Sequence, residues 1–66
     1  MRVTVVIPVL NEEAELPEVI AHVRRGAVPG SVEIVVVDGG SSDRTVQTAR
    51  RLADRTLELS RSGRAY

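Results

Sequence analysis

The 66-residue chain predicts an α/β fold, in which three parallel strands alternate with two helices. Short runs of β-branched residues alternate with segments whose apolar residues recur at helical spacing. Proline and glycine separate these segments. The strongest runs are apolar on both faces, which is typical of strands in a parallel sheet.

The first predicted strand and helix lie within residues 3–25. Val3 to Ile7 is a β-branched run that ends at Pro8, so we expect a strand there. A helix is predicted over roughly Leu16 to Arg25, because its apolar residues share one helical face. These residues are Leu16, Val19, Ile20 and Val23. Gly26 is a suitable residue to end this helix.

The second half repeats the same order of elements. Val32 to Val37 has the strongest strand pattern in the chain. Asp38 to Ser42 is a glycine-rich turn, after which Ser42 or Asp43 is expected to cap a helix over roughly Arg44 to Asp54. Thr56 to Leu59 is a weak third strand. The result is a βαβαβ unit.

This unit leaves one face of its sheet bare. Two right-handed crossovers in the same direction place both helices on the same face. The opposite face, carrying Val6, Val35 and Val37 or their counterparts, then has no cover, because the sequence holds no third helix. Either another chain covers it or more of this chain does, and the ending within the polar segment 60–66 favours the second. We therefore expect a truncated domain, marginally stable alone.

Composition excludes several classes of protein. Nine arginines balance nine acidic residues, so no general attraction to nucleic acid is expected. Cysteine is absent, which excludes disulfides and thiolate metal sites. The apolar run at the N-terminus is too short for a transmembrane segment, and Pro8 and Asn11 interrupt a signal peptide. We expect a cytoplasmic protein and leave open a peripheral position at the inner face of the membrane.

Polar loops follow the first two strands. In parallel sheets, ligands bind beyond the carboxyl ends of the strands. If these strands are neighbours, they lie about 4.8 Å apart. Asn11 and Glu12 from one loop and Asp38 from the other would then converge on one crevice. This convergence is the main functional inference from the residues themselves.

Asp38 supports two interpretations. An ionised carboxylate only accepts hydrogen bonds, so it suits a ring N–H or ribose hydroxyls, and Gly39 and Gly40 would let a flat ring approach the backbone. Alternatively, Asp38 merely closes a turn, as aspartates often do. Its place at the carboxyl end of a strand favours ligand contact.

Other polar residues near the loops have structural interpretations. Asp43 is expected to cap the second helix, and Ser41 and Ser42 to serve as turn or cap groups. Glu13 is expected to be a solvated loop residue, whereas for Glu12 ligand contact and solvation both stand open. His22 is expected to be a packing or surface residue. Arg61 and Arg64 would suit a diphosphate, although solvated arginines are commoner.

Two common nucleotide-binding motifs are missing. The loop after the first strand contains no glycine, so the dinucleotide-binding fingerprint is absent. The chain also contains no lysine, which excludes a P-loop. Oxidoreductase, nucleotidyltransferase and NTPase hypotheses are therefore weak.

Two motifs, in this order, resemble the start of glycosyltransferase family 2. They are Val5-Val6-Ile7-Pro8-Val9-Leu10-Asn11-Glu12-Glu13 and Glu33-Ile34-Val35-Val36-Val37-Asp38-Gly39-Gly40-Ser41-Ser42-Asp43-Arg44-Thr45. The usual family forms are IPxxNE and VDDGSxDxT, so Gly39 replaces the commoner second aspartate. Ser62-Gly63-Arg64-Ala65 is similar to a loop that follows these two motifs in members of the family. The resemblance covers almost the whole chain, but only the first third or less of a family catalytic domain.

The resemblance implies a Rossmann-like GT-A fold, of which residues 1–66 would be the incomplete N-terminal part that binds a nucleotide sugar. The donor would be a UDP- or GDP-linked sugar and the acceptor is unknown. By position, Pro8, Asn11 and Glu12 would line the nucleoside pocket and Asp38 would bind the base beside Gly39. Arg64 would approach the diphosphate. The divalent cation of the family, Mg²⁺ or Mn²⁺, would be bound by residues that this chain lacks.

Two functional hypotheses follow. In the first, the chain is a fragment of a glycosyltransferase. It is then inactive alone, because no residue is left that could bind a metal ion or act as a general base. In the second, it is a small nucleotide-binding or docking module whose bare sheet face is completed by a partner chain.

Overall fold

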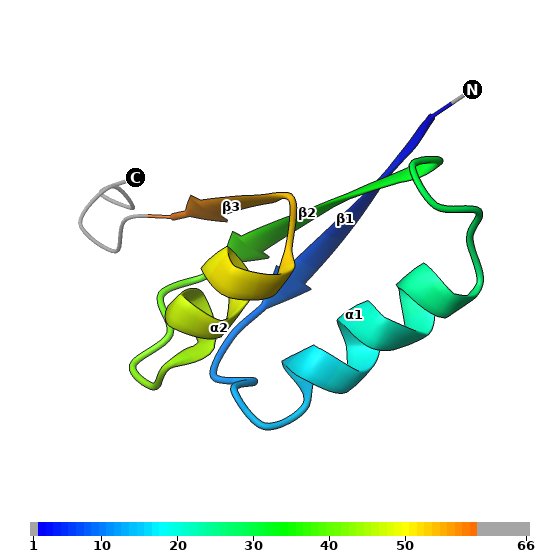
Figure 1. Ribbon diagram of the computed structural model, residues 1–66. Helices are drawn as coiled ribbons and strands as arrows, with labels where there is room; N and C mark the ends of the chain where they lie inside the picture. Colours follow the sequence, from blue (N-terminus) through cyan, green and yellow to red (C-terminus); the bar gives the residue numbers. More distant parts are fainter. Residues whose placement is uncertain (1, 60–66) are drawn as a thin grey trace.

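The computed structural model describes residues 2–59, and they form the predicted βαβαβ unit (Figure 1). The elements are β1 (Val3–Val9), α1 (Leu16–Arg25), β2 (Val32–Asp38), α2 (Thr45–Leu52) and β3 (Arg55–Glu58). The strands form one sheet in the order β1-β2-β3, and both pairs are parallel. The predicted α/β class is therefore confirmed.

The register brings the carboxyl ends of the first two strands level. Val3 pairs with Val32, and the pairing runs without a break to Val9 and Asp38. Asp38 is also the register partner of Glu58 on β3. The loops after β1 and β2 therefore leave the sheet side by side at the same edge.

Both helices lie on one face of the sheet (Figure 1). Their apolar stripes and the strand residues that point toward them form a single core. The buried members are Val9, Leu16, Ile20, Ile34, Val36 and Ala49. Two crossovers of the same hand produce this two-layer arrangement, as predicted.

The opposite face of the sheet is uncovered in residues 2–59. Val6 is 59% exposed and Leu57 is 44% exposed. Val37, beside them on β2, is half-buried. Val35 is buried on the same face because it lies on the central strand between two neighbours. The bare apolar face inferred from the sequence is thus present in the fold.

β1 continues two residues beyond its predicted end at Ile7, through Pro8 to Val9. The N–H of Val3 donates to the carbonyl of Ser31 at 2.8 Å, and the carbonyl of Val9 accepts from the N–H of Gly39 at 2.9 Å. Alternate residues of β1 therefore bond to β2, and Pro8 falls between them. Its nitrogen faces the outer edge of the sheet, where the missing N–H removes no bond between strands.

The second helix is shorter than predicted, ending at Leu52 rather than Asp54. Ala53 is extended, and Asp54 instead bonds to β2. Its N–H donates to the carbonyl of Ile34 at 3.0 Å, and its carboxylate accepts from the Ile34 N–H at 2.7 Å. These bonds start β3 at Arg55, one residue earlier than expected. The first helix ends at Gly26 as predicted, without a left-handed conformation.

Truncation of a core side chain should unfold the isolated chain. Leu16 is 1% exposed, and Leu16→Ala should cost about 2–5 kcal/mol, a large share of the stability that a domain of this size has. Val6→Ala, on the bare face, should change stability by about 0.5 kcal/mol or less. Thermal melts followed by circular dichroism will compare them, and equal losses would contradict the two-layer core.

Candidate functional site

The loops after β1 and β2 are joined by hydrogen bonds at the carboxyl edge of the sheet. The N–H of Asn11 donates to the Ser41 hydroxyl at 2.8 Å. In return, the Asn11 side-chain oxygen accepts from the N–H of Ser42 at 2.7 Å and from its hydroxyl at 3.3 Å. Asn11 has a φ of 51°, in the left-handed region that asparagine tolerates better than most residues. Asn11 is therefore anchored on both its main chain and its side chain.

A second set of bonds joins the same loops closer to the helices. The N–H of Glu12 donates to the Thr45 hydroxyl at 2.8 Å. The N–H of Glu13 donates to the Asp43 carboxylate at 3.3 Å, and the Glu13 carboxylate accepts from the N–H of Arg44 at 3.2 Å. Glu13 is thus exposed, as expected, but its carboxylate is bonded to the neighbouring loop.

Asp43 organises the start of α2. Its carboxylate accepts from the N–H of Thr45 at 2.9 Å and from the Thr45 hydroxyl. The hydrogen bond from that hydroxyl is the main cause that lowers the pKa of Asp43. Asp43 thus closes a turn just before α2 and does not take the predicted N-cap position, which Arg44 occupies without a side-chain bond.

Asp38 closes the turn after β2. It is 2% exposed, and one carboxylate oxygen accepts from the N–H groups of Gly40 and Ser41, both at 2.9 Å. The other oxygen accepts from the Ser41 hydroxyl. Burial raises the pKa of Asp38, but the hydrogen bonds from Ser41 and Gly40 outweigh it and lower the pKa. The turn-closing interpretation is confirmed, and ligand contact by Asp38 stays a prediction.

The remaining predicted site residues within the described part of the chain are exposed to solvent. Pro8 and Glu12 are exposed, and within residues 2–59 the Glu12 carboxylate has no hydrogen bond or ion pair. Gly39 is also exposed, and an added Cβ there would meet only the Val9 carbonyl at 3.5 Å and a Leu10 methyl at 4.0 Å. Arg64, like Arg61, lies outside the described residues.

Two polar residues have structural roles that the sequence did not indicate individually. Ser41 links Asp38 to the loop after β1, and fully buried Thr45 links that loop to Asp43. The signal for both was the spacing from an aspartate, three residues before Ser41 and two before Thr45, which is typical of side-chain-closed turns. The serines were predicted only as turn or cap groups in general.

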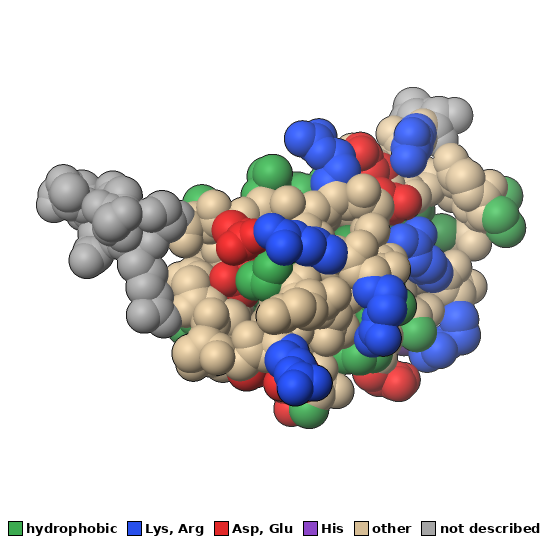
Figure 2. All heavy atoms as spheres, turned by 60° about the vertical axis from the view of Figure 1, so that its left-hand side comes forward, with side chains coloured by type: hydrophobic (Ala, Val, Ile, Leu, Met, Phe, Trp, Pro, Cys, Tyr) green, Lys and Arg blue, Asp and Glu red, His purple; other side chains and the backbone are tan. Residues whose placement is uncertain are grey.

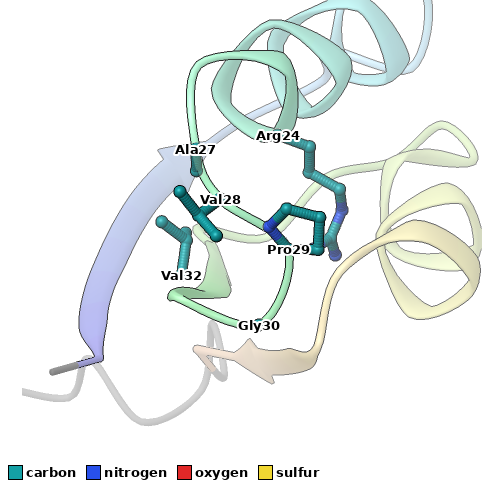
Figure 3. Close-up of a pocket in the computed structure, with 6 residues that line it drawn as sticks. All are labelled: Arg24, Ala27, Val28, Pro29, Gly30 and Val32. Carbon is teal, nitrogen blue, oxygen red and sulfur yellow. The ribbon is translucent and has the colours of Figure 1, made fainter.

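Two hollows lie on the surface of the described residues. The first, of about 300 Å³, lies at the amino end of β2 and is shown in Figure 3. It is lined by Arg24, Ala27, Val28, Pro29, Gly30 and Val32. The second, of about 360 Å³, lies along α2 and is lined by Glu13, Arg44, Gln47, Thr48 and Arg51. Neither of these hollows is lined by Asn11, Glu12 or Asp38, whereas the second touches the joined loops through Glu13 and Arg44.

The described residues offer no metal site. Among residues 2–59, no group of three histidine or acidic side chains lies close enough together to hold a metal ion. His22 is exposed on α1. We therefore derive no metal-dependent step from these residues. In the same part of the chain, no helix has the length and apolarity to span a bilayer. Figure 2 shows acidic and basic side chains interspersed over one face of the molecule.

A parallel sheet with two helices on one face, and with polar loops joined at its carboxyl edge, defines an α/β protein. The chain belongs to glycosyl transferase family 2, whose family model matches residues 4–64. It is 43% identical over 49 residues to the succinoglycan biosynthesis protein ExoA of Rhizobium meliloti, covering 74% of this chain and 15% of that protein.

Other relatives agree with this assignment. An undecaprenyl-phosphate 4-deoxy-4-formamido-L-arabinose transferase of Pseudomonas paraeruginosa is 44% identical over 55 residues, covering 80% of this chain and 16% of the relative. An uncharacterized glycosyltransferase of Mycobacterium bovis is 47% identical over 49 residues, covering 74% and 20% respectively. The matched segment thus spans a fifth or less of each relative's length. No solved structure matches the chain significantly.

Acid should unfold the chain through three aspartates. Hydrogen bonds lower the pKa of Asp38, Asp43 and Asp54 in the fold; for Asp54 the main cause is the N–H of Ile34. The resulting stability is present above the ordinary aspartate pKa of about 3.9, and is lost as pH falls through the lower folded-state values. The melting temperature should therefore fall as the pH drops below about 4.

Two variants test the cause of this acid sensitivity. Asp54→Asn should weaken the dependence of the melting temperature on pH, because residue 54 no longer titrates. Glu18→Gln is the control, since within residues 2–59 the Glu18 carboxylate makes only an exposed ion pair with Arg25 at 3.7 Å. Parallel acid curves for Asp54→Asn and the parent chain would contradict the assignment.

Proposed function

We propose that this chain is the donor-binding part of a larger glycosyltransferase, which transfers a sugar from a UDP- or GDP-linked donor to an acceptor that we leave open. Membership of glycosyl transferase family 2 supports the reaction class. The observation that carries the proposal is the joining of the two motif loops, through Asn11, Ser41 and Ser42, at the edge where parallel sheets bind ligands. The site of action proposed is the cytoplasm, with a peripheral position at the membrane left open.

The proposed nucleoside surface consists of the exposed positions at this edge and the buried Asp38. Asp38 would accept a hydrogen bond from a ring N–H. The oxygen that would accept it already accepts one hydrogen bond, from the Ser41 hydroxyl, and a carboxylate oxygen can accept two. Approach to Asp38 would pass over Gly39, which is exposed and has no side chain. The assigned residues are Pro8, Asn11, Glu12, Asp38 and Gly39, with Arg64 at the diphosphate.

Gly39→Ala should weaken nucleotide binding without harming the fold. The new methyl group meets only ordinary contacts inside the protein, at 3.5 Å or more, but it projects into the space proposed for the base. Overpacking by one carbon costs roughly 1–3 kcal/mol, which is about a 5- to 150-fold loss of affinity. Isothermal titration calorimetry with UDP and with GDP will measure it. Asp38→Ala is a less clean test, because the same carboxylate closes the turn.

Gly26→Ala is the matched control for this change. Gly26 caps α1 with a φ of −86°, and an added Cβ there would lie 3.9 Å from its nearest neighbours. The substitution is chemically the same but lies after α1, away from the joined loops. Equal affinity of Gly39→Ala and Gly26→Ala for both nucleotides would remove Gly39 from the binding surface.

The 66-residue chain alone should not catalyse transfer. Reaction with a nucleotide-sugar donor needs a group to neutralise the leaving diphosphate and, in an inverting enzyme, a base for the acceptor hydroxyl. We assign the cation, Mg²⁺ or Mn²⁺, and the base to the larger protein. Incubation of the chain with labelled nucleotide sugars and either metal should yield neither transfer nor hydrolysis, and sustained turnover would contradict the proposal.

A docking module is the second candidate, and the bare sheet face favours it. Exposed Val6 and Leu57 lie on the same face as Val37, and contiguous apolar surfaces of this kind often mark interfaces. In this alternative, a partner chain would complete the nucleotide-binding module. A cohesive, folded dimer in sedimentation experiments would favour the module, whereas an open-ended mixture of aggregates would favour an incomplete domain.

A further inference from the structure

Ser41 lies where the turn after β2 meets the loop after β1. Its hydroxyl accepts from the N–H of Asn11 at 2.8 Å and donates to the carboxylate of Asp38. Its own N–H donates to the other oxygen of Asp38 at 2.9 Å. One residue thus contacts both Asp38, the last residue of β2, and Asn11, in the loop after β1, which are 27 positions apart in the sequence.

We propose that Ser41 is a positioning residue, which holds Asp38 and Asn11 at a fixed separation so that the nucleoside meets both in one arrangement. The inference rests on the proposed function for its consequence, nucleotide affinity. The linkage itself rests on the hydrogen bonds of the unliganded chain. Ser41 acts through Asn11 and Asp38 and is not assigned a contact with the ligand.

The chemistry of the hydroxyl group explains why serine suits this position. A hydroxyl has one donor and two acceptor lone pairs, and Ser41 uses the donor on a carboxylate and an acceptor on an amide. Alanine would lose both bonds. Threonine would retain the hydroxyl and both bonds, so it is the conservative variant for rescue.

Loss of the Ser41 hydroxyl would remove a hydrogen bond from both Asn11 and Asp38. The Asn11 N–H would lose its acceptor, although its side chain would still be held by Ser42. Asn11 also has a φ of 51°, a conformation that persists when the surroundings hold it. At the other end, Asp38 would keep two backbone donors but lose its only side-chain donor among the described residues.

Charged groups around Asp38 bear on how it titrates. Asp43, in the same turn, is the nearby acidic group that raises the pKa of Asp38. On β3, Glu58 is its register partner, and the Glu58 carboxylate pairs with Arg50 of α2. β1 places the uncharged Val9 beside it. The loop after β1 adds Glu12, Glu13 and Glu15. Because the hydrogen bond from the Ser41 hydroxyl lowers the pKa of Asp38, removing that hydroxyl should raise it.

The experiment compares Ser41→Ala and Ser41→Thr with Ser31→Ala. Ser31 donates its hydroxyl to the Val28 carbonyl at 2.6 Å, at the amino end of β2, so it is a matched serine outside the linkage. NMR will follow the titration of the Asp38 carboxyl carbon and the hydrogen exchange of the Asn11 amide in the nucleotide-free chain. Calorimetry with UDP and GDP will then give the affinities.

For Ser41→Ala we expect a raised Asp38 pKa, Asn11 amide exchange at least about fivefold faster, and nucleotide affinity about five- to tenfold weaker. Ser41→Thr should stay within about twofold of the parent chain in both rates and affinities. Ser31→Ala should leave the titration, the exchange and the affinities unchanged. Melts of all variants will confirm that they remain folded.

Each failure has a distinct signature. If Ser41→Ala changes neither the Asp38 titration nor the Asn11 exchange, the linkage is wrong. If it changes both but binds nucleotide like the parent chain, Ser41 has a structural role only and the positioning proposal is overturned. If the parent chain binds neither UDP nor GDP, the proposed function fails instead, and the NMR results alone decide the linkage.

Discussion

The hydrogen bonds between the loop after β1 and the loop after β2 are the constraint on which the rest of this structure depends. They convert two separate strand ends into one surface, and they use side chains from both motifs: Asn11, Glu13, Ser41, Asp43 and Thr45. Each bond satisfies a main-chain N–H in one of the two loops. Polar residues typical of a binding motif therefore also hold the fold together, so a loss of function on substitution has two possible physical origins.

Burial is distributed unevenly across the sheet, and this determines where stability comes from. The buried core cluster lies between the sheet and the two helices, whereas on the other face Val35 alone is buried among the described residues. Because this core is thin, polar bonds such as those between Asp54 and Ile34 contribute a larger share of the stability than they would in a thicker domain. The same reasoning links acid sensitivity to carboxylates rather than to packing.

The class of fold, the order of its elements and the bare face could all be predicted from apolar periodicity, because β-branched runs and helical stripes are local signals. The structural roles of Pro8 and Asp54 were harder to predict from the sequence. A proline normally ends a strand, and only the edge position of β1 makes it harmless. Asp54 fits a helix until the main-chain carbonyl and N–H of Ile34 are brought near it. For the site, the proximity of the two loops followed from the topology of the sheet. The hydrogen-bond partners of Asp38 and Ser41 depend instead on turn geometry, which the amino-acid sequence does not specify.

Pro8 has a consequence for what the outer side of β1 can accept. Residues 4, 6 and 8 point their main-chain groups away from β2, and a proline among them leaves donors only at Thr4 and Val6. An added strand would find two donors in the first half of β1 and a gap near the loop that carries Asn11. Pairing with an added strand is therefore favoured along the amino half of β1. A strand paired there would leave the carboxyl end of the sheet, where ligands are expected, uncovered.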